Sequence, residues 1–197
     1  DKLLEETNYP LELRRSQEIS TTCTNIPDIF FPVYYPEYSS PKVLVMDWLE
    51  GDHLKEFLDK KPSQEVKNRI AQALWDFYNH QLHTALAIHA DPHPGNFLLQ
   101  KDGRVGVIDF GCVKVVPEYF YYHYFPLLVP EIRNNQAVVD QLLSHIEIIF
   151  PQDSPAVKVE LQTAFLEMTA LLSRPFETEN FQFTHEFIDE IYAKGEE

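Results

Sequence analysis

The sequence is poor in cysteine and in positive charge, and each shortage excludes a class of protein. Its two cysteines, Cys23 and Cys112, are too few for a disulfide framework or a zinc site, and we expect reduced thiols in a reducing compartment. The 16 basic and 31 acidic residues give a net charge of −15. That charge repels nucleic-acid phosphates, so we expect no nucleic-acid partner.

Long apolar runs are also lacking. No stretch approaches the roughly 18 apolar residues of a membrane span, and the charged residues 1–6 do not resemble a signal peptide. With 44% apolar residues over 197 positions, we expect one sizeable globular domain or the larger part of a two-lobed one. The expected location is the cytoplasm or the periphery of a membrane, and the sequence leaves the oligomeric state open.

The most informative stretch is a dense polar motif in the middle of the chain. It reads His-Ala-Asp-Pro-His-Pro-Gly-Asn from His89 to Asn96 and is followed by Asp-Phe-Gly at 109–111. In the kinase signature H-R-D-L-x-x-x-N, the aspartate lies two residues after the histidine and the asparagine five residues after the aspartate. Asp91 and Asn96 have this spacing, which indicates a phosphoryl-transfer site.

The segment between Asn96 and Asp109 predicts a short β-hairpin. Two mainly apolar runs, Phe97–Gln100 and Val105–Ile108, flank a polar turn that contains Gly103. Since the two strands of a hairpin start and end side by side, this hairpin carries Asn96 and Asp109 to one place.

These residue types have the chemistry that transfer of the γ-phosphoryl group of ATP needs. A carboxylate and an amide oxygen hold Mg²⁺ against the phosphates, and we predict Asp109 and Asn96 as these metal ligands. A second carboxylate accepts the proton of the attacking hydroxyl or orients that hydroxyl. We predict Asp91 in this catalytic role.

A transition-metal site is the alternative interpretation of this stretch. His89, Asp91 and His93 alternate in the manner of metal ligands, but a metal site leaves Asn96 and the Asp-Phe-Gly motif unexplained. We expect His89 to be a buried structural residue that supports the loop. The role of His93 is left open.

The octapeptide followed by Ile-Asp-Phe-Gly resembles the UbiB family of atypical kinases, also called aarF-domain or coenzyme Q biosynthesis kinases. Aminoglycoside and choline phosphotransferases share the looser pattern H-x-D-x-x-x-x-N and then I-D-x-G, and are the nearest competitors. The resemblance implies an α+β, protein-kinase-like fold with a mostly helical C-lobe and a partial N-lobe of hinge strands and one helix. It also implies ATP and Mg²⁺ as cofactors and a link to isoprenoid quinone (ubiquinone) or lipid metabolism.

The N-terminal part is expected to supply the rest of the nucleotide site. Residues 2–19 predict a helix that Pro10 kinks or restarts. In the family this helix carries an E-x-D motif and, after it, the glutamate that pairs with the nucleotide-binding lysine. By resemblance Glu6 begins the motif and Glu12 is that glutamate, whereas Asn8 stands where the family has aspartate. The alternative is that Glu5, Glu6 and Glu12 lie on a solvated face of the helix.

The family also implies how the adenine is held. By resemblance Met46 is the gatekeeper residue, and Asp47, Trp48 and Leu49 form the hinge that presents backbone groups to adenine. Leu98, on the strand that follows Asn96 in the sequence, is also expected to contact the nucleotide.

The lobes are predicted to divide after residue 50, into a partial N-lobe at 1–50 and a C-lobe at 51–197. In the first, the runs at 33–35 and 43–46 predict an antiparallel pair. In the second, apolar residues recur every three or four positions. The predicted helices are a short one capped by Asp52, a longer one from Ser63 into the catalytic loop, and three more around 138–149, 157–172 and 181–192.

The stretch after Asp-Phe-Gly is short. Protein kinases have a long activation segment ending in A-P-E, whereas here only residues 112–118 precede an aromatic run at 119–125. This argues against a protein substrate and favours a small molecule or a lipid. We expect the aromatic run to form helix core rather than a lipid-facing surface.

Glycine is scarce as well. None of the six glycines belongs to a phosphate-binding loop, and no Val-Ala-Ile-Lys-like strand precedes the first predicted helix. We therefore expect the chain to begin after those parts of a kinase have passed. Two functions stay open: an ATP-dependent kinase or ATPase of the UbiB type, and a non-catalytic kinase-like module that binds nucleotide or a partner. The presence of Asp91, Asn96 and Asp109 favours the first.

Overall fold

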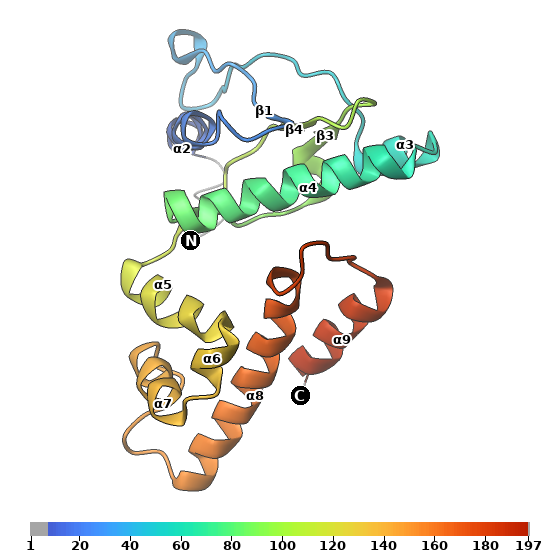
Figure 1. Cartoon of the computed structure of the whole chain (residues 1–197). Helices are drawn as coiled ribbons and strands as arrows, with labels where there is room; N and C mark the ends of the chain where they lie inside the picture. The colour runs from blue at the N-terminus through green and yellow to red at the C-terminus, as the bar shows by residue number, and fades with distance from the viewer. Residues whose placement is uncertain (1–7, 197) are drawn as a thin grey trace. The chain divides into compact units, whose positions relative to one another are not determined.

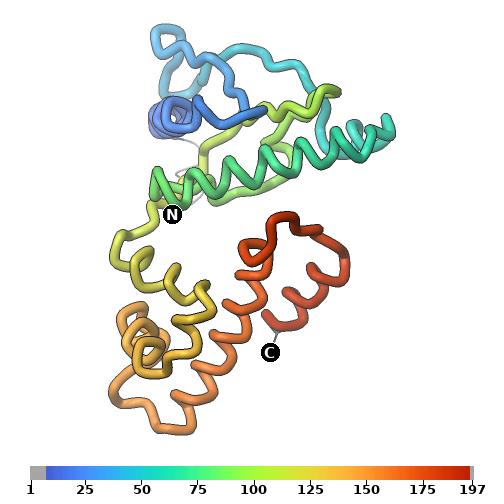
Figure 2. The backbone as a smooth tube through the Cα atoms, in the orientation of Figure 1, coloured from blue at the N-terminus to red at the C-terminus, as the bar shows by residue number. Residues whose placement is uncertain are grey.

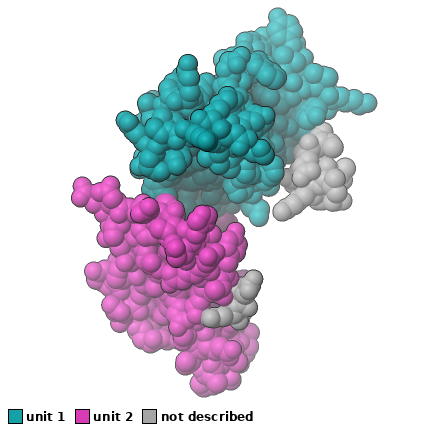
Figure 3. Space-filling model, turned by 90° about the vertical axis from the view of Figure 1, so that its right-hand side faces the viewer, with its two compact units in different colours: residues 1–116 teal, residues 117–197 magenta. Residues whose placement is uncertain are grey.

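The computed structural model describes residues 8–196 and divides the chain into two compact units, Asp1–Val116 and Pro117–Glu197. Figure 3 colours the two units separately. Each unit has an apolar core of its own. The lobe boundary expected after residue 50 falls inside the first unit and remains a prediction.

The first unit combines helices with short strands. Its helices are α2 (Tyr9–Thr22), α3 (Leu54–Asp59) and α4 (Gln64–His80), with the helical turns η1 (Pro36–Tyr38), η2 (Gln81–Ala85) and η3 (Pro94–Asn96). Its strands are β1 (Ile29–Phe30), β2 (Ala87–His89), β3 (Phe97–Leu99), β4 (Val105–Val107) and β5 (Val113–Val115). The predicted α+β class is confirmed.

Strands β1, β4 and β3 form a three-stranded sheet in that order. β3 and β4 are antiparallel with Leu98 opposite Gly106, which confirms the predicted hairpin. β1 runs parallel to β4 and pairs Ile29 with Val105. Helix α4 lies along this sheet (Figure 1). The residues that α4 buries are Ile70, Ala73 and Phe77.

An irregular segment leads from β1 to α3 and arches above the strands in Figure 2. The antiparallel pair predicted here is confirmed as a narrow ladder. The N–H groups of Tyr35 and Asp47 donate to the carbonyls of Val45 and Val33, each at 2.9 Å. The ladder ends at Asp47, the first residue of the predicted hinge.

The end of the predicted hinge is attached to β3. The backbones of Asp52 and Leu99 exchange two hydrogen bonds of 2.9 and 2.8 Å. The prediction that Asp52 caps α3 is wrong, because the N-cap residue is His53. The Asp52 carboxylate instead accepts hydrogen bonds of 2.6 and 2.7 Å from Lys60 Nζ.

Pro10 lies in the first turn of α2, where a backbone N–H has no helical partner to lose. The helix therefore starts here rather than being kinked, and it continues to Thr22, beyond its predicted end. Asn8 is the N-cap, with its Oδ1 accepting a hydrogen bond from Leu11 N at 3.2 Å. Glu6, predicted to begin the E-x-D motif, lies outside the described residues.

The second unit is helical where it is described, as predicted, although the helix ends differ from those expected. Its elements are α5 (Glu118–Tyr124), η4 (Phe125–Leu128), α6 (Pro130–Arg133), α7 (Gln136–His145), α8 (Pro155–Ser173), η5 (Arg174–Phe176) and α9 (His185–Glu196). The fully or nearly fully buried core residues are Leu127, Val139, Leu143, Ile146 and Ile149. Within residues 8–196, no helix has the length and apolar character needed to cross a membrane.

The aromatic run is only partly helix core. Phe120 and Tyr124 pack against the buried cluster of the second unit. Tyr119 and Tyr122, on the same helix α5, are 62% and 64% exposed. The prediction of core packing therefore holds for one face of α5 and is wrong for the other.

We expect Gly51→Ala to destabilise the protein by about 1–3 kcal/mol, as overpacking does. A β-carbon at Gly51 would lie 2.8 Å from Leu98 Cβ and 3.1 Å from the Leu98 carbonyl carbon, so the hinge would have to separate from β3. Urea unfolding followed by circular dichroism measures the effect.

The matched control is Gly195→Ala in α9, where the nearest heavy atom to an added β-carbon is Met168 Cε at 4.0 Å. This change should stabilise its helix by no more than about 1 kcal/mol. Equal effects of the two substitutions would contradict the tight contact at Gly51.

Candidate active site

The β3–β4 hairpin joins the two predicted metal ligands at its base. Ile108 N donates to Asn96 O at 3.1 Å, which extends the ladder by one step beyond Phe97 and Val107. Asn96 therefore ends the catalytic loop directly beside the backbone that enters Asp109. The hairpin brings the two residues together as the sequence predicts, while their role as metal ligands remains a prediction.

Asp91 and Asn96 are connected across the catalytic loop. Asn96 Nδ2 donates to the backbone carbonyl of Asp91 at 3.1 Å and to the Asp91 carboxylate oxygen Oδ2 at 3.4 Å. The amide nitrogen thus faces Asp91, which leaves Asn96 Oδ1 directed away from it. Asp91 is exposed and Asn96 is half-buried, so both are accessible to a ligand.

The Asp109 carboxylate is held by the chain that follows it. Gly111 N donates to Asp109 Oδ1 at 2.7 Å. Gly111 is held in turn from α2, because Arg15 Nη1 donates to Gly111 O at 2.9 Å. Between them Phe110 is fully buried, and its ring lies 5.4 Å from that of His89. The Asp-Phe-Gly segment is therefore fixed by both packing and hydrogen bonds.

His89 is a buried structural residue, as predicted. It is 1% exposed, and its backbone N–H donates to the Oε1 atom of the equally buried Gln81 at 2.7 Å. Burial lowers the pKa of the imidazole, an effect that the charges of Asp109 and Asp91 partly oppose. Strand β2 ends at His89 and pairs antiparallel with β5, which ties the catalytic loop to the chain after Gly111.

His93, whose role the sequence leaves open, supports the turn of the loop. Its Nδ1 accepts a hydrogen bond from Gly95 N at 3.0 Å, and its side chain is exposed. His89 and His93 thus occupy different environments, one buried and one in solvent. In residues 8–196, no group of three or more His, Cys, Asp or Glu side chains is placed to hold a metal ion.

Helix α2 brings Glu12 into the electrostatic field of Asp109. Burial, and then the negative charge of Asp109, raise the pKa of Glu12 to about 7. Burial also raises the pKa of Tyr34 to about 12, with the charges of Glu12 and Asp109 adding to the shift and the neighbouring Ser16 hydroxyl opposing it. The Ser16 and Tyr34 hydroxyls are both buried. The role of Glu12 at the nucleotide stays a prediction from resemblance, and Tyr34 is a neighbour that the sequence does not predict.

The predicted nucleotide-binding residues Leu49 and Leu98 lie on one part of the sheet. A β-carbon built on Gly106 would be 3.1 Å from Leu49 Cδ1, and Leu98 is the cross-strand partner of Gly106. Met46, the predicted gatekeeper, forms an isolated bridge with Tyr34 and is 36% exposed. Their contact with a nucleotide remains a prediction.

The Asp47 side chain has a local partner. Its carboxylate accepts a hydrogen bond of 2.8 Å from Tyr35 OH, and a longer one of 3.3 Å from Val33 N. Trp48, the next residue of the predicted hinge, is 87% exposed. The hinge can therefore offer its backbone to a ligand, while the Asp47 side chain holds the ladder together.

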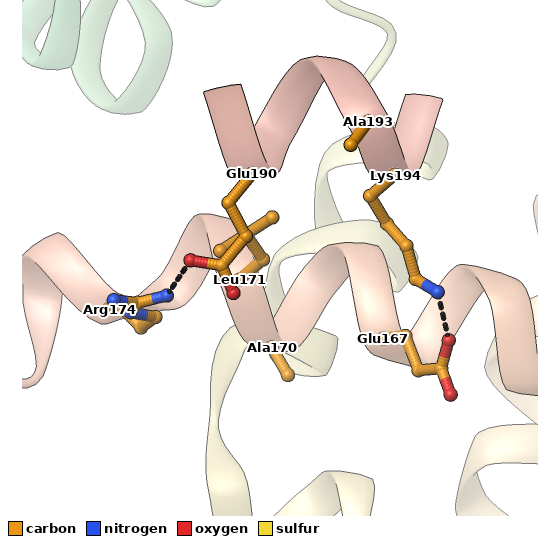
Figure 4. Close-up of a pocket in the computed structure, with 7 residues that line it drawn as sticks. All are labelled: Glu167, Ala170, Leu171, Arg174, Glu190, Ala193 and Lys194. Carbon is orange, nitrogen blue, oxygen red and sulfur yellow. Dashed lines mark hydrogen bonds and ion pairs between the residues drawn. The ribbon is translucent and has the colours of Figure 1, made fainter. Parts of the chain in front are cut away.

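Two hollows lie outside the catalytic loop. One, of about 550 Å³, is lined by the hinge end Glu50–Asp52, by α3 and the start of α4, and by the turn after β3. The other, of about 540 Å³, lies between α8 and α9 (Figure 4). The ion pairs Arg174–Glu190 and Glu167–Lys194, at 2.6 and 2.5 Å, join α9 to η5 and to α8. None of Asp91, Asn96 and Asp109 lines either hollow.

The donor set at the hairpin base fits Mg²⁺. This ion prefers hard oxygen ligands and uses one or two protein carboxylates together with waters and substrate phosphates. Asp109 Oδ2 and Asn96 Oδ1 are such oxygens, since Gly111 N–H binds the other Asp109 oxygen and Asp91 faces the Asn96 nitrogen. A closed cage of protein ligands is not needed.

Comparison with known proteins gives a family match. Residues 1–143 match the ABC1 atypical kinase-like domain. The chain is 32% identical over 118 residues to Protein ACTIVITY OF BC1 COMPLEX KINASE 1, chloroplastic, of Arabidopsis thaliana, which covers 60% of this chain and 17% of that protein. It is 31% identical over 138 residues to AarF domain-containing protein kinase 1 of Xenopus tropicalis, covering 64% and 26%.

Longer matches extend the likeness toward the C-terminus. AarF domain-containing kinase 1 of Drosophila melanogaster is 28% identical over 192 residues, which is 89% of this chain and 34% of that protein. Rv3197 of Mycobacterium tuberculosis, solved as a complex with erythromycin, has a TM-score of 0.71 at 24% identity and matches 95% of this chain. The chain spans 46% of that structure and about a sixth to a third of these curated relatives. The predicted kinase-like fold with a partial N-lobe is confirmed.

We expect Glu12→Gln to flatten the pH dependence of stability. Because folding raises the pKa of Glu12 from 4.5 to about 7, the folded state binds more protons between these values. The stability that Glu12 contributes is thus complete below about pH 4.5 and is lost as the pH rises through 7. Since the side chain is only half-buried, we expect Glu12 to change the free energy of unfolding by about 1 kcal/mol over this pH range, which is less than the full pKa shift would give.

Urea unfolding at pH 5 and pH 8 measures this difference between wild type and variant. Glu18→Gln, exposed on the same helix α2, is the matched control. A Glu12→Gln variant with the same pH dependence as Glu18→Gln would contradict the raised pKa.

Proposed function

The chain belongs to the ABC1 atypical kinase-like family, and on that premise we propose that it is an enzyme that binds MgATP and transfers or hydrolyses the γ-phosphoryl group. The base of the β3–β4 hairpin carries this proposal, because Asn96 there lies beside both Asp91 and the backbone entering Asp109. Phosphoryl transfer depends on positioning and charge neutralisation. The amide of Asn96 and the carboxylates of Asp91 and Asp109 are groups suited to positioning the reactants and to holding the metal that neutralises charge.

We assign Asn96 and Asp109 as the protein ligands of Mg²⁺. When bound there, Mg²⁺ would neutralise the charge that develops on the phosphate oxygens. The hydrogen bond from Gly111 N fixes one Asp109 oxygen, and the hydrogen bonds to Asp91 fix the Asn96 amide plane. Both ligands are thus oriented before nucleotide and metal arrive.

Asp91 is assigned to the nucleophile. Its carboxylate accepts or orients the proton of the attacking hydroxyl or water. The loop that presents it is supported by the Asn96 contact to its backbone and by the buried side chain of His89. Support from a buried residue keeps an exposed carboxylate in a defined place.

Adenine is proposed to lie against Leu49 and Leu98, with its polar edge on the hinge backbone. Among the backbone–backbone hydrogen bonds of residues 8–196, none involves the carbonyl of Asp47 or the N–H of Leu49. These are the kind of backbone groups that a bound adenine uses. Glu12 is proposed to pair with an ammonium group at the phosphates, whose charge would lower its pKa again.

The substrate is proposed to be a small molecule or a lipid, in keeping with the quinone metabolism that the resemblance implies. After Gly111 the chain enters β5 directly, and β5 pairs with β2 through Val113 and His89. Helix α5 then begins at Glu118. This route contains no long exposed segment on which a peptide could be aligned, so a protein substrate is disfavoured.

We expect Asp109→Asn to abolish Mg²⁺-dependent nucleotide binding in the intact protein, because the charged metal ligand is lost. Calorimetric titration with ATP in the presence and absence of Mg²⁺ measures it. Asp102→Asn, exposed at the tip of the same hairpin, removes the same charge and should leave binding unchanged. Undiminished MgATP affinity in Asp109→Asn would refute the metal assignment.

Asp91→Asn should separate binding from turnover. Loss of a general base slows turnover by on the order of 10² to 10⁴, while the nucleotide, held elsewhere, should bind with nearly wild-type affinity. Phosphate release and ATP titration on the same variant test this, with Asp59→Asn as an exposed control. Turnover that survives the change would refute the role of Asp91, whereas turnover that is absent from wild type would favour a non-catalytic nucleotide-binding module.

A further inference from the structure

Helix α2 turns a single face toward the Asp-Phe-Gly segment. Residues three and four apart share a face of a helix, and Glu12, Ser16 and Ile19 are half-buried, buried and buried at such spacing. Arg15 lies between them and is also half-buried. From this face Arg15 Nη1 reaches across a long sequence separation to the carbonyl of Gly111, at 2.9 Å.

Gly111 is held on both sides of its α-carbon. Its carbonyl accepts the hydrogen bond from Arg15, and its N–H donates to Asp109 Oδ1 at 2.7 Å. The following carbonyl, of Cys112, accepts a hydrogen bond of 2.8 Å from Ala90 N. The Asp109 carboxylate is thus connected to α2 through a single residue, Gly111.

Glycine makes this connection dependent on Arg15. A residue without a side chain has the widest choice of backbone conformations, so its direction has to be set by the bonds its backbone makes. A side chain here would also be crowded, since a β-carbon would lie 3.3 Å from Asp109 Oδ1. A hydrogen bond from a guanidinium is roughly twice as strong as a neutral one, which suits Arg15 to the task.

We propose that Arg15 is a positioning residue, which sets the orientation of the Asp109 carboxylate by holding Gly111 from helix α2. The proposal rests on the metal role assigned to Asp109. Its consequence is that α2 and the metal site move together, because a shift of α2 withdraws the Arg15 donor from Gly111. Glu12, on the same helix face, then changes its place relative to Asp109 in the same movement.

The test measures the affinity for Mn²⁺, used as a paramagnetic substitute for Mg²⁺, in the intact protein saturated with ADP. Loss of a residue that orients a metal ligand weakens metal binding by about 10-fold, and we expect this of Arg15→Ala. Arg14→Ala, the exposed neighbour on α2, removes the same charge and should leave the affinity within about twofold, as surface charges contribute little.

A second measurement follows the hydrogen bond between Gly111 N–H and Asp109. Amide hydrogen exchange at Gly111 should become about 10-fold faster in Arg15→Ala, because the hydrogen bond to Asp109 opens more often, while exchange within α2 stays as in wild type. A merely structural role of Arg15 would instead accelerate exchange along α2 and leave both Gly111 and the Mn²⁺ affinity unchanged. That result would overturn the proposal.

Arg15→Lys keeps the experiment decisive if Arg15→Ala does not fold. Lysine retains the charge but loses the planar fork of arginine, so we expect an intermediate effect of about threefold on Mn²⁺ affinity. Wild-type affinity and wild-type Gly111 exchange in Arg15→Lys would overturn the requirement for the guanidinium. Failure of the wild-type protein to bind Mn²⁺ would refute the metal role of Asp109, whereas wild-type binding that neither Arg15 variant alters refutes the role of Arg15 alone.

Discussion

The burial of Phe110 is the interaction on which the candidate site depends. Its ring is fully enclosed and lies 5.4 Å from the ring of His89 and 5.9 Å from that of Phe31. One apolar side chain thus fixes the residue between Asp109 and Gly111 against the strand that leads into the catalytic loop. Side chains in a close-packed core have little freedom to shift. The buried Phe110 ring therefore also fixes the positions of its polar neighbours Asp109 and Gly111.

Around that contact the polar residues are distributed by local geometry. The β3–β4 hairpin brings the backbone at Asn96 beside the backbone that enters Asp109. The pairing of β2 with β5 then places the chain after Gly111 beside the strand that enters the catalytic loop. Helix α2, from the far end of the sequence, completes the site with Arg15 and Glu12. The charge of Asp109 therefore lies where a sheet, a loop and a helix meet, with one carboxyl neighbour that is neutral over part of the physiological pH range.

Much of this arrangement could be predicted from the sequence because it is local. The spacing from Asp91 to Asn96, the polar turn of the hairpin and the periodicity of α4 are all read within a few residues, and the structure has each of them. Contacts across long separations could not be read in this way. The parallel pairing of β1 with β4 depends on tertiary packing that no periodicity encodes. The same is true of the hydrogen bond from Arg15 to Gly111.

The wrong predictions have the same origin. Asp52 has the chemistry of a helix cap, but its backbone pairs with Leu99 and leaves the cap position to His53. Asn8 departs from the family motif in the sequence and is also the N-cap of α2. Aspartate and asparagine can each cap a helix or serve another role, and the backbone conformation around Asp52 and Asn8 determines which of these roles each residue has.

The direct passage from Gly111 into β5 also limits how such a protein could be controlled. In an enzyme with a long activation loop, a modification can order or release that loop and so open or close the substrate groove. Here the chain beyond Gly111 pairs with β2 as strand β5. Among the described residues, helix α2 contacts this segment through Arg15, and a shift of α2 as a rigid body would reach the site. The timescale of control would then be that of helix motion, microseconds to milliseconds, rather than that of a covalent mark.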